Sequence, residues 1–98
     1  MGVLVSTKYV DIDVDSFYLT SMLAPEQSRA ARGWLDWSQE QLAEHANVSL
    51  STVRDFEKGR RTPIPNNLAA MRDALLAAGV RMTFVNDHAS GILDARVG

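Results

Sequence analysis

The sequence predicts a small, mainly α-helical domain that ends in a short β element. Residues 38–59 contain two short amphipathic segments separated by a turn, and residues 66–78 carry apolar side chains at helical spacing. Residues 80–85 instead alternate apolar and polar side chains, as strands do. The chain has 98 residues, of which 46% are hydrophobic, so it can build one modest core and needs no second domain.

Three regions follow from this pattern: an N-terminal extension over residues 1–21, a helical domain over residues 22–79, and a C-terminal β element and tail over residues 80–98. In the extension, Tyr9–Asp15 alternates apolar and acidic side chains, which favours a half-buried strand. A terminal segment that does not dock would instead be disordered, and the sequence leaves both alternatives open.

The acidic residues of the extension also have the Asp-x-Asp-x-Asp spacing that begins a calcium-binding loop. Such a loop needs glycine at its sixth position and glutamate at its twelfth, and this chain has Ser16 and Met22 there. The sequence therefore predicts no calcium site.

The first helix is expected over residues 25–35. Pro25 suits a first helical turn, where its missing amide costs no hydrogen bond, and Glu26 lies near the positive end of the helix dipole. We expect the buried face of this helix to consist of Ala30, Ala31 and either Trp34 or Leu35.

The next helix begins at a capping box formed by Ser38 and Gln41. Asn47 tolerates the left-handed conformation that a sharp turn needs, and Ser49 can cap the helix that follows. Helical spacing assigns the inward positions of the two helices to Leu42, Ala43, Ala46, Val53 and Phe56.

Residues 60–65 contain two prolines and are expected to be non-helical. A further helix should start at Asn66 or Asn67 and end near Gly79, with four apolar positions inward: Leu68, Met71, Leu75 and Leu76. A strand is expected over Val80–Val85, followed by a turn over residues 86–91 and a second strand over Ile92–Val97.

Several functional classes are disfavoured by composition. The chain has no cysteine and no apolar run long enough to cross a membrane, which predicts a cytoplasmic protein without disulfides. His45 and His88 have no metal-site or catalytic-triad spacing and are expected at the surface. The glycines form no phosphate-binding loop. We therefore predict no catalytic residues, no metal and no cofactor.

Charge gives a mixed indication. The net charge is −2, whereas nucleic-acid binders are usually basic. Cations nevertheless gather at and just beyond the second of the two short helices, and this basic cluster consists of Arg54, Lys58, Arg60 and Arg61, with Asp55 inside it. Its position is compatible with DNA because local charge matters more than the total.

The chain also resembles a known family, the XRE-type helix-turn-helix regulators that include phage Cro proteins and repressors. The resemblance runs from about residue 22 to residue 84 and rests on Trp37-Ser38-Gln39, Leu42-Ala43, Val48-Ser49, Ser51-Thr52-Val53 and Glu57-Lys58-Gly59-Arg60-Arg61-Thr62-Pro63. It implies a compact five-helix fold like that of lambda repressor, with a short C-terminal strand or hairpin. It also implies that Arg32 in the first helix forms a structural pair with Glu57.

The resemblance further implies transcriptional control through double-stranded operator DNA, with a homodimer as the compatible assembly. In the family, the second helix of the pair enters the major groove and the preceding helix contacts the backbone. Carried onto this chain, the DNA-binding set is Gln39, Ser49, Leu50, Ser51, Arg54, Asp55, Lys58, Arg60 and Arg61. Gln39 would contact phosphate or support the reading residues, although it can also belong to the helix cap.

Two residues of this set depart from a simple DNA reader. Leu50 can touch a thymine methyl group but cannot hydrogen-bond a base, and Asp55 repels phosphates. An exposed leucine among mixed charges also suits a protein interface. The alternative hypothesis is therefore an antiactivator that keeps the helix-turn-helix fold but binds and inhibits another regulator, as in the control of quorum sensing or mobile elements.

Overall fold

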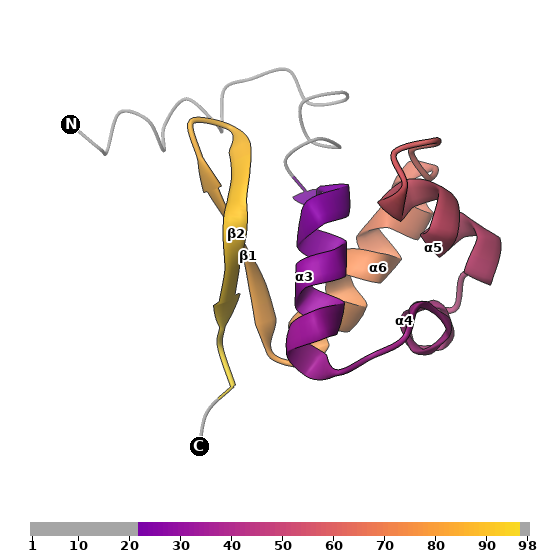
Figure 1. The fold of residues 1–98 in the computed structure, drawn as a ribbon, viewed down its shortest axis with the longest axis horizontal. Coiled ribbons are helices and arrows are strands. Elements are labelled where there is room, and N and C mark those ends of the chain that lie inside the picture. The colour runs from indigo at the N-terminus through magenta and orange to yellow at the C-terminus, as the bar shows by residue number, and fades with distance from the viewer. Residues whose placement is uncertain (1–21, 97–98) are drawn as a thin grey trace.

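The computed structural model describes residues 22–96. Within them lie four helices and a two-stranded antiparallel sheet (Figure 1). In chain order these are α3 (Pro25–Leu35), α4 (Gln39–Ala46), α5 (Leu50–Glu57), α6 (Pro65–Ala77), β1 (Val80–Val85) and β2 (His88–Asp94). The mainly helical domain with a C-terminal hairpin is confirmed, whereas a fifth helix is not among the described residues. The expectations for residues 1–21 lie outside the described range.

Helix α3 lies between the hairpin on one side and the other helices on the other (Figure 1). It begins at Pro25, as predicted, and ends at Asp36, whose backbone is left-handed with φ 61° and ψ 38°. Its buried residues are Gln27, Ser28 and Ala31. The predicted burial of Ala30 is wrong, because Ala30 is exposed. Of the two alternatives Trp34 and Leu35, it is Leu35 that packs partly against the core, whereas Trp34 is 54% exposed.

The predicted capping and turn chemistry of α4 and α5 is confirmed. Ser38 Oγ accepts from the backbone amide of Gln41 at 3.0 Å, and Gln41 Oε1 accepts from the backbone amide of Ser38 at 2.8 Å. Asn47 is left-handed, with φ 58° and ψ 44°. Ser49 Oγ accepts from the Thr52 amide at 3.1 Å and thus caps α5. Together these bonds satisfy helix-end donors that would otherwise have no partner in the helix.

The core lies where α3 to α6 meet and extends to the start of β1. All the inward positions predicted for α4 and α5 are buried, and so are Leu68, Met71 and Leu75 of α6. Leu76 is only half-buried. The fully or nearly fully buried apolar side chains are Met22, Leu23, Ala31, Leu42, Ala43, Ala46, Val53, Phe56, Leu68, Met71, Leu75 and Val80.

Helix α6 starts one residue before the predicted positions, because Pro65 occupies its first turn and Ile64 its N-cap. Strand β1 has the predicted bounds, but β2 begins at His88 instead of Ile92 and ends at Asp94. The reason is a tight two-residue turn: Asn86 and Asp87 both have positive φ, 52° and 71°, as a type I′ hairpin turn requires. A register shift between Thr83 and Phe84 accommodates one extra residue in β2.

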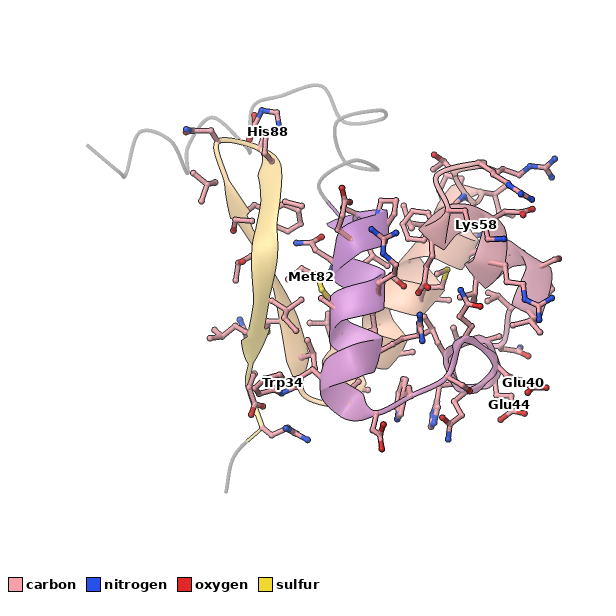
Figure 2. The ribbon with its side chains drawn as sticks, in the orientation of Figure 1. Trp34, Glu40, Glu44, Lys58, Met82 and His88 are labelled. Carbon is pink, nitrogen blue, oxygen red and sulfur yellow. The ribbon has the colours of Figure 1, made fainter. Side chains whose placement is uncertain are left out.

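One face of the hairpin packs on the helices. Met82 and Ile92 are paired across the strands and pack against the core, and Figure 2 shows Met82 between the hairpin and α3. The buried Gln27 amide joins α3 to this hairpin: its Nε2 donates to Thr83 O at 2.9 Å and to Gly91 O at 3.1 Å. No helix in the described part of the chain has the length and apolarity needed to cross a membrane.

Candidate nucleic-acid interface

The outward face of α5 combines small polar, apolar and charged side chains. Ser51, Arg54 and Lys58 are exposed, whereas Leu50 and Asp55 are half-buried. Figure 2 shows Lys58 at the end of α5, on the side of the molecule opposite the hairpin. The outward positions predicted for α5 therefore lie on a surface that is open to a ligand.

Ser49 lies at the start of this face, but its hydroxyl is engaged locally. Its Oγ lies 3.1 Å from Ser51 Oγ and 2.8 Å from Thr52 Oγ1, besides capping the Thr52 amide. Ser49 thus fixes the geometry of the first turn of α5 and orders the hydroxyl of Ser51.

The basic cluster has few acidic partners. Within residues 22–96, Arg60 Nη1 lies 4.0 Å from Asp55 Oδ1, and no ion pair joins Arg54, Lys58 or Arg61 to an acidic residue. All four cations are exposed. Exposed cations without intramolecular partners are available to an anionic ligand.

The buried side of α5 is held by a polar network around Glu57, whose side chain is 1% exposed. Arg32 donates two hydrogen bonds to the Glu57 carboxylate: Nη2 lies 2.8 Å from Oε1, and Nε lies 2.9 Å from Oε2. Ser28 Oγ donates to Oε2 at 2.6 Å, and Gln39 Nε2 donates to Oε1 at 3.0 Å. The expected pair of Arg32 and Glu57 is therefore present as a bidentate contact.

Further contacts tie this network to the backbone. Arg32 Nη1 donates to Trp37 O at 3.0 Å, and Arg29 Nη1 donates to Glu57 O at the end of α5. Burial raises the pKa of Glu57, but the hydrogen bonds from Arg32, Ser28 and Gln39 and the attraction of Arg32 outweigh it, so the pKa lies below its ordinary value. Glu57 is thus an ionised, fully coordinated anchor between α3, α4 and α5.

For Gln39, the structure favours one of the roles that the sequence left open. Its side-chain amide bonds Glu57 and thereby supports α5, while the cap of α4 is made by Ser38 and Gln41. Sequence reasoning missed Ser28 and Arg29. Ser28 lies four residues before Arg32 on α3, so the two share one helix face. This spacing could have predicted that Ser28 contacts the same partner as Arg32.

Acidic and aromatic side chains lie on α4. Glu40 and Glu44 are exposed and extend outward from this helix (Figure 2). His45 is exposed, as predicted, and its ring stacks on Trp37 with 4.1 Å between ring centroids. In the described part of the chain, no three His, Asp or Glu side chains come together in a way that would hold a metal ion.

Comparison with known proteins agrees with this geometry. Residues 29–75 match the family model HTH_3, described as Helix-turn-helix, and this range includes α4, α5 and most of α3 and α6. The chain therefore carries an XRE-type helix-turn-helix domain over residues 29–75. Members of this family are typically DNA-binding regulators without catalytic activity. A search of curated proteins found no match to the chain.

Proposed function

We propose that this protein is a transcriptional regulator that binds operator DNA through α5. The observation that carries the proposal is the contrast between the two sides of α5: its buried side is fixed by Glu57, and its exposed side presents cations without intramolecular partners in the described residues. A rigid helix with an open basic face is what major-groove recognition needs.

Each residue of the interface then has a role. Arg54, Lys58, Arg60 and Arg61 neutralise phosphates and position the protein on the duplex. Ser51 faces base edges, Leu50 contacts a thymine methyl group, and Asp55 accepts from a cytosine or adenine amino group. Gln39 supports α5 through its hydrogen bond to Glu57. The remaining hydrogen of its side-chain amide can be donated to a phosphate of the DNA backbone. A homodimer would place two such helices on two half-sites.

A titration tests this function. We would measure fluorescence anisotropy of a labelled duplex from the promoter beside the protein's own gene, with a scrambled duplex as competitor, at low and at physiological salt. The proposal expects tighter binding of the promoter duplex at physiological salt, where nonspecific electrostatic binding is weak. Equal affinity for both duplexes would contradict it.

A second function is favoured by Leu50 and by charge. Leu50 and Asp55 are both partly exposed on α5, and the whole chain has a net charge of −2. These features suit an antiactivator that binds another regulatory protein through α5 and does not bind DNA.

The variants Leu50→Asp and Arg54→Ala separate the two functions. Leu50→Asp places a charge in the apolar part of a protein interface and should abolish partner binding. For a DNA reader, Arg54→Ala should instead weaken binding to every duplex. Circular dichroism would verify that both variants keep the fold, since both positions lie on the outward face of α5.

A further inference from the structure

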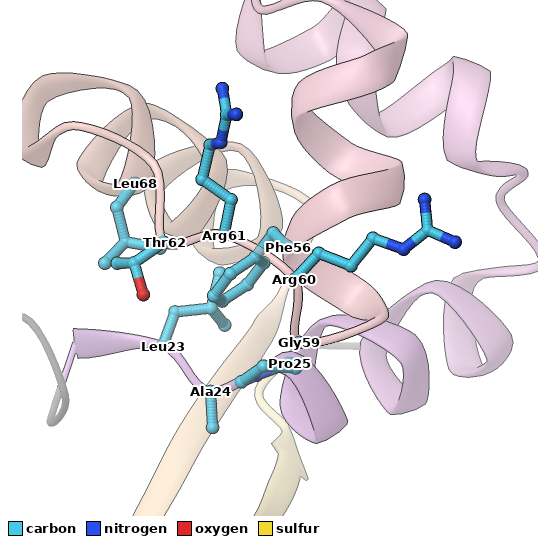
Figure 3. A pocket seen from close by; sticks show the side chains of 9 residues that line it. All are labelled: Leu23, Ala24, Pro25, Phe56, Gly59, Arg60, Arg61, Thr62 and Leu68. Carbon is cyan, nitrogen blue, oxygen red and sulfur yellow. The ribbon is translucent and has the colours of Figure 1, made fainter.

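A hollow of about 320 Å³ lies between the start of α3, the end of α5 and the loop that follows α5 (Figure 3). Its apolar wall is formed by Leu23, Phe56 and Leu68, which belong to the core and are at most 3% exposed, so an occupant would contact only their edges. Arg60 and Arg61 line it from the loop, and Figure 3 shows their guanidinium groups extending outward in different directions. The hollow therefore fits an apolar group that has negative charge beside it.

The chain itself carries such a group directly upstream. Leu23 and Ala24 line the hollow, and Phe17, Tyr18 and Leu19 precede Leu23 by six to four residues. An extended chain spans up to about 3.3–3.6 Å per residue, so these side chains lie within about 20 Å of Leu23 along the chain. Any contact they make with the hollow is intramolecular, which gives it an effective concentration in the millimolar range.

The same segment supplies the negative charge. Residues 1–21 contain Asp11, Asp13 and Asp15 against the single cation Lys8. Arg61 has no acidic partner within residues 22–96, and Arg60 has only the 4.0 Å contact with Asp55. The apolar and acidic parts of the segment thus match the apolar wall and the two arginines of the hollow.

We propose that residues 11–19 dock onto this hollow, with Phe17–Leu19 against the apolar wall and the three aspartates near Arg60 and Arg61. Arg60 and Arg61 also belong to the proposed phosphate-binding cluster, so the docked segment competes with DNA for them. The proposed docking is argued from the hollow and the sequence alone. The proposed competition with DNA also rests on the proposed function.

Engineered disulfides test the docking without DNA. The chain has no cysteine, so in the full-length double variant Ser16→Cys with Thr62→Cys, which keeps the anchor Phe17–Leu19, the rate of intramolecular disulfide formation reports contact between the segment and the hollow. Thr62 lines the hollow and is exposed. Ser16→Cys with Ser90→Cys, an exposed position on β2, is the matched control.

Docking predicts that the Thr62 pair oxidises at least about tenfold faster than the Ser90 pair, because docking holds the segment beside Thr62 and away from Ser90, although both pairs share one tether. Replacing all three aspartates by asparagine should reduce this advantage, because it removes the attraction to Arg60 and Arg61. Equal oxidation rates for the two pairs would overturn the proposal.

Anisotropy with the promoter duplex tests the competition. The full-length variant Phe17→Ser with Tyr18→Ser leaves the net charge unchanged and removes the apolar anchor. It should bind the duplex about three- to tenfold more tightly at low salt, the size expected for two or three released surface ion pairs. The gain should shrink at high salt. Unchanged affinity for the duplex would overturn the proposed competition between the segment and DNA. If the protein binds no duplex but the Thr62 pair still oxidises fast, the proposed function is refuted and the docking of the segment is not.

Discussion

The two sides of α5 differ in how completely their charges are matched. On the inner side, Glu57 accepts hydrogen bonds from Arg32, Ser28 and Gln39, and its side chain is 1% exposed. On the outer side, Arg54 and Lys58 are exposed and have no acidic partner in the described part of the chain.

This difference assigns the two sides to different tasks. A buried carboxylate is tolerated only when its lone pairs are taken up by donors, and the geometry of those donors then fixes the crossing of α3, α4 and α5. Exposed cations contribute little to folding and remain free for a ligand. Substitutions on the inner side should therefore change stability, and those on the outer side should change binding.

The largest effect is expected for Arg32→Ala. This variant leaves the ionised Glu57 buried without its main partner, which should lower the free energy of unfolding by about 3–5 kcal/mol. Urea denaturation followed by circular dichroism measures it. As a control, Arg72→Ala removes the exposed pair with Asp73 and should cost less than about 1 kcal/mol. Similar losses in the two variants would refute the assignment of Glu57 as the anchor of α5.

A somewhat smaller effect is expected for Gln27→Ala on the other face of α3. The buried Gln27 side chain accepts from the Ala24 amide at 2.9 Å and donates to Thr83 O and Gly91 O. Removing it leaves these three backbone groups without that partner and should cost about 2–3 kcal/mol. Gln41→Ala, which removes one exposed capping bond, should cost about 1 kcal/mol or less. Hydrogen exchange should further show that Gln27→Ala loosens the hairpin before the helices.

Acid should weaken the inner side of α5 selectively. The pKa of folded Glu57 lies below its ordinary value of 4.5, so its ionised form stabilises the fold at higher pH, and this contribution is lost as the pH falls through the folded pKa. The free energy of unfolding of the wild type should therefore fall below pH 4.5. The Glu57→Gln variant, although less stable at pH 7, should show a shallower fall. Parallel pH profiles would contradict the role assigned to the charge.

The smallest effect is expected at the end of α3. Asp36 is exposed and left-handed, a conformation that costs a residue with a Cβ roughly 1 kcal/mol more than it costs glycine. Asp36→Gly should thus raise the melting temperature slightly and leave DNA binding unchanged, because the residue belongs to the end of α3 and not to the outward face of α5. A lower melting temperature in this variant would contradict the prediction, because it would mean that the Asp36 side chain makes a stabilising contact beyond the backbone role of this residue at the end of α3.

Local chemistry made the helical part of the fold predictable. The bonds of Ser38, Asn47 and Ser49 join residues close in sequence, so their spacing alone was informative. The pair of Arg32 and Glu57 was foreseen only through the family resemblance, because the two residues are 25 positions apart. Which exposed residues contact DNA or a protein stays a prediction.

The errors arose where distant contacts decide. Ala30 was expected inside because it is apolar, but α3 turns Gln27 and Ser28 inward, where Thr83 and Glu57 satisfy their polar groups. A buried polar residue looks like a surface residue until its partners are known. The hairpin turn was placed too broadly because Asn86 and Asp87 form it alone, and the following polar residues were mistaken for loop although they pair in β2.

The most direct test of the account is the salt dependence of DNA binding by the outer face of α5. Anisotropy with the promoter duplex from 50 to 300 mM salt gives the slope of log affinity against log salt for the wild type, Arg54→Ala and Arg61→Ala. The account predicts that each variant binds more weakly and flattens the slope by up to about 0.9, the share of one lost phosphate contact. Specific binding with the wild-type affinity and slope in both variants would contradict the claim that this face binds DNA.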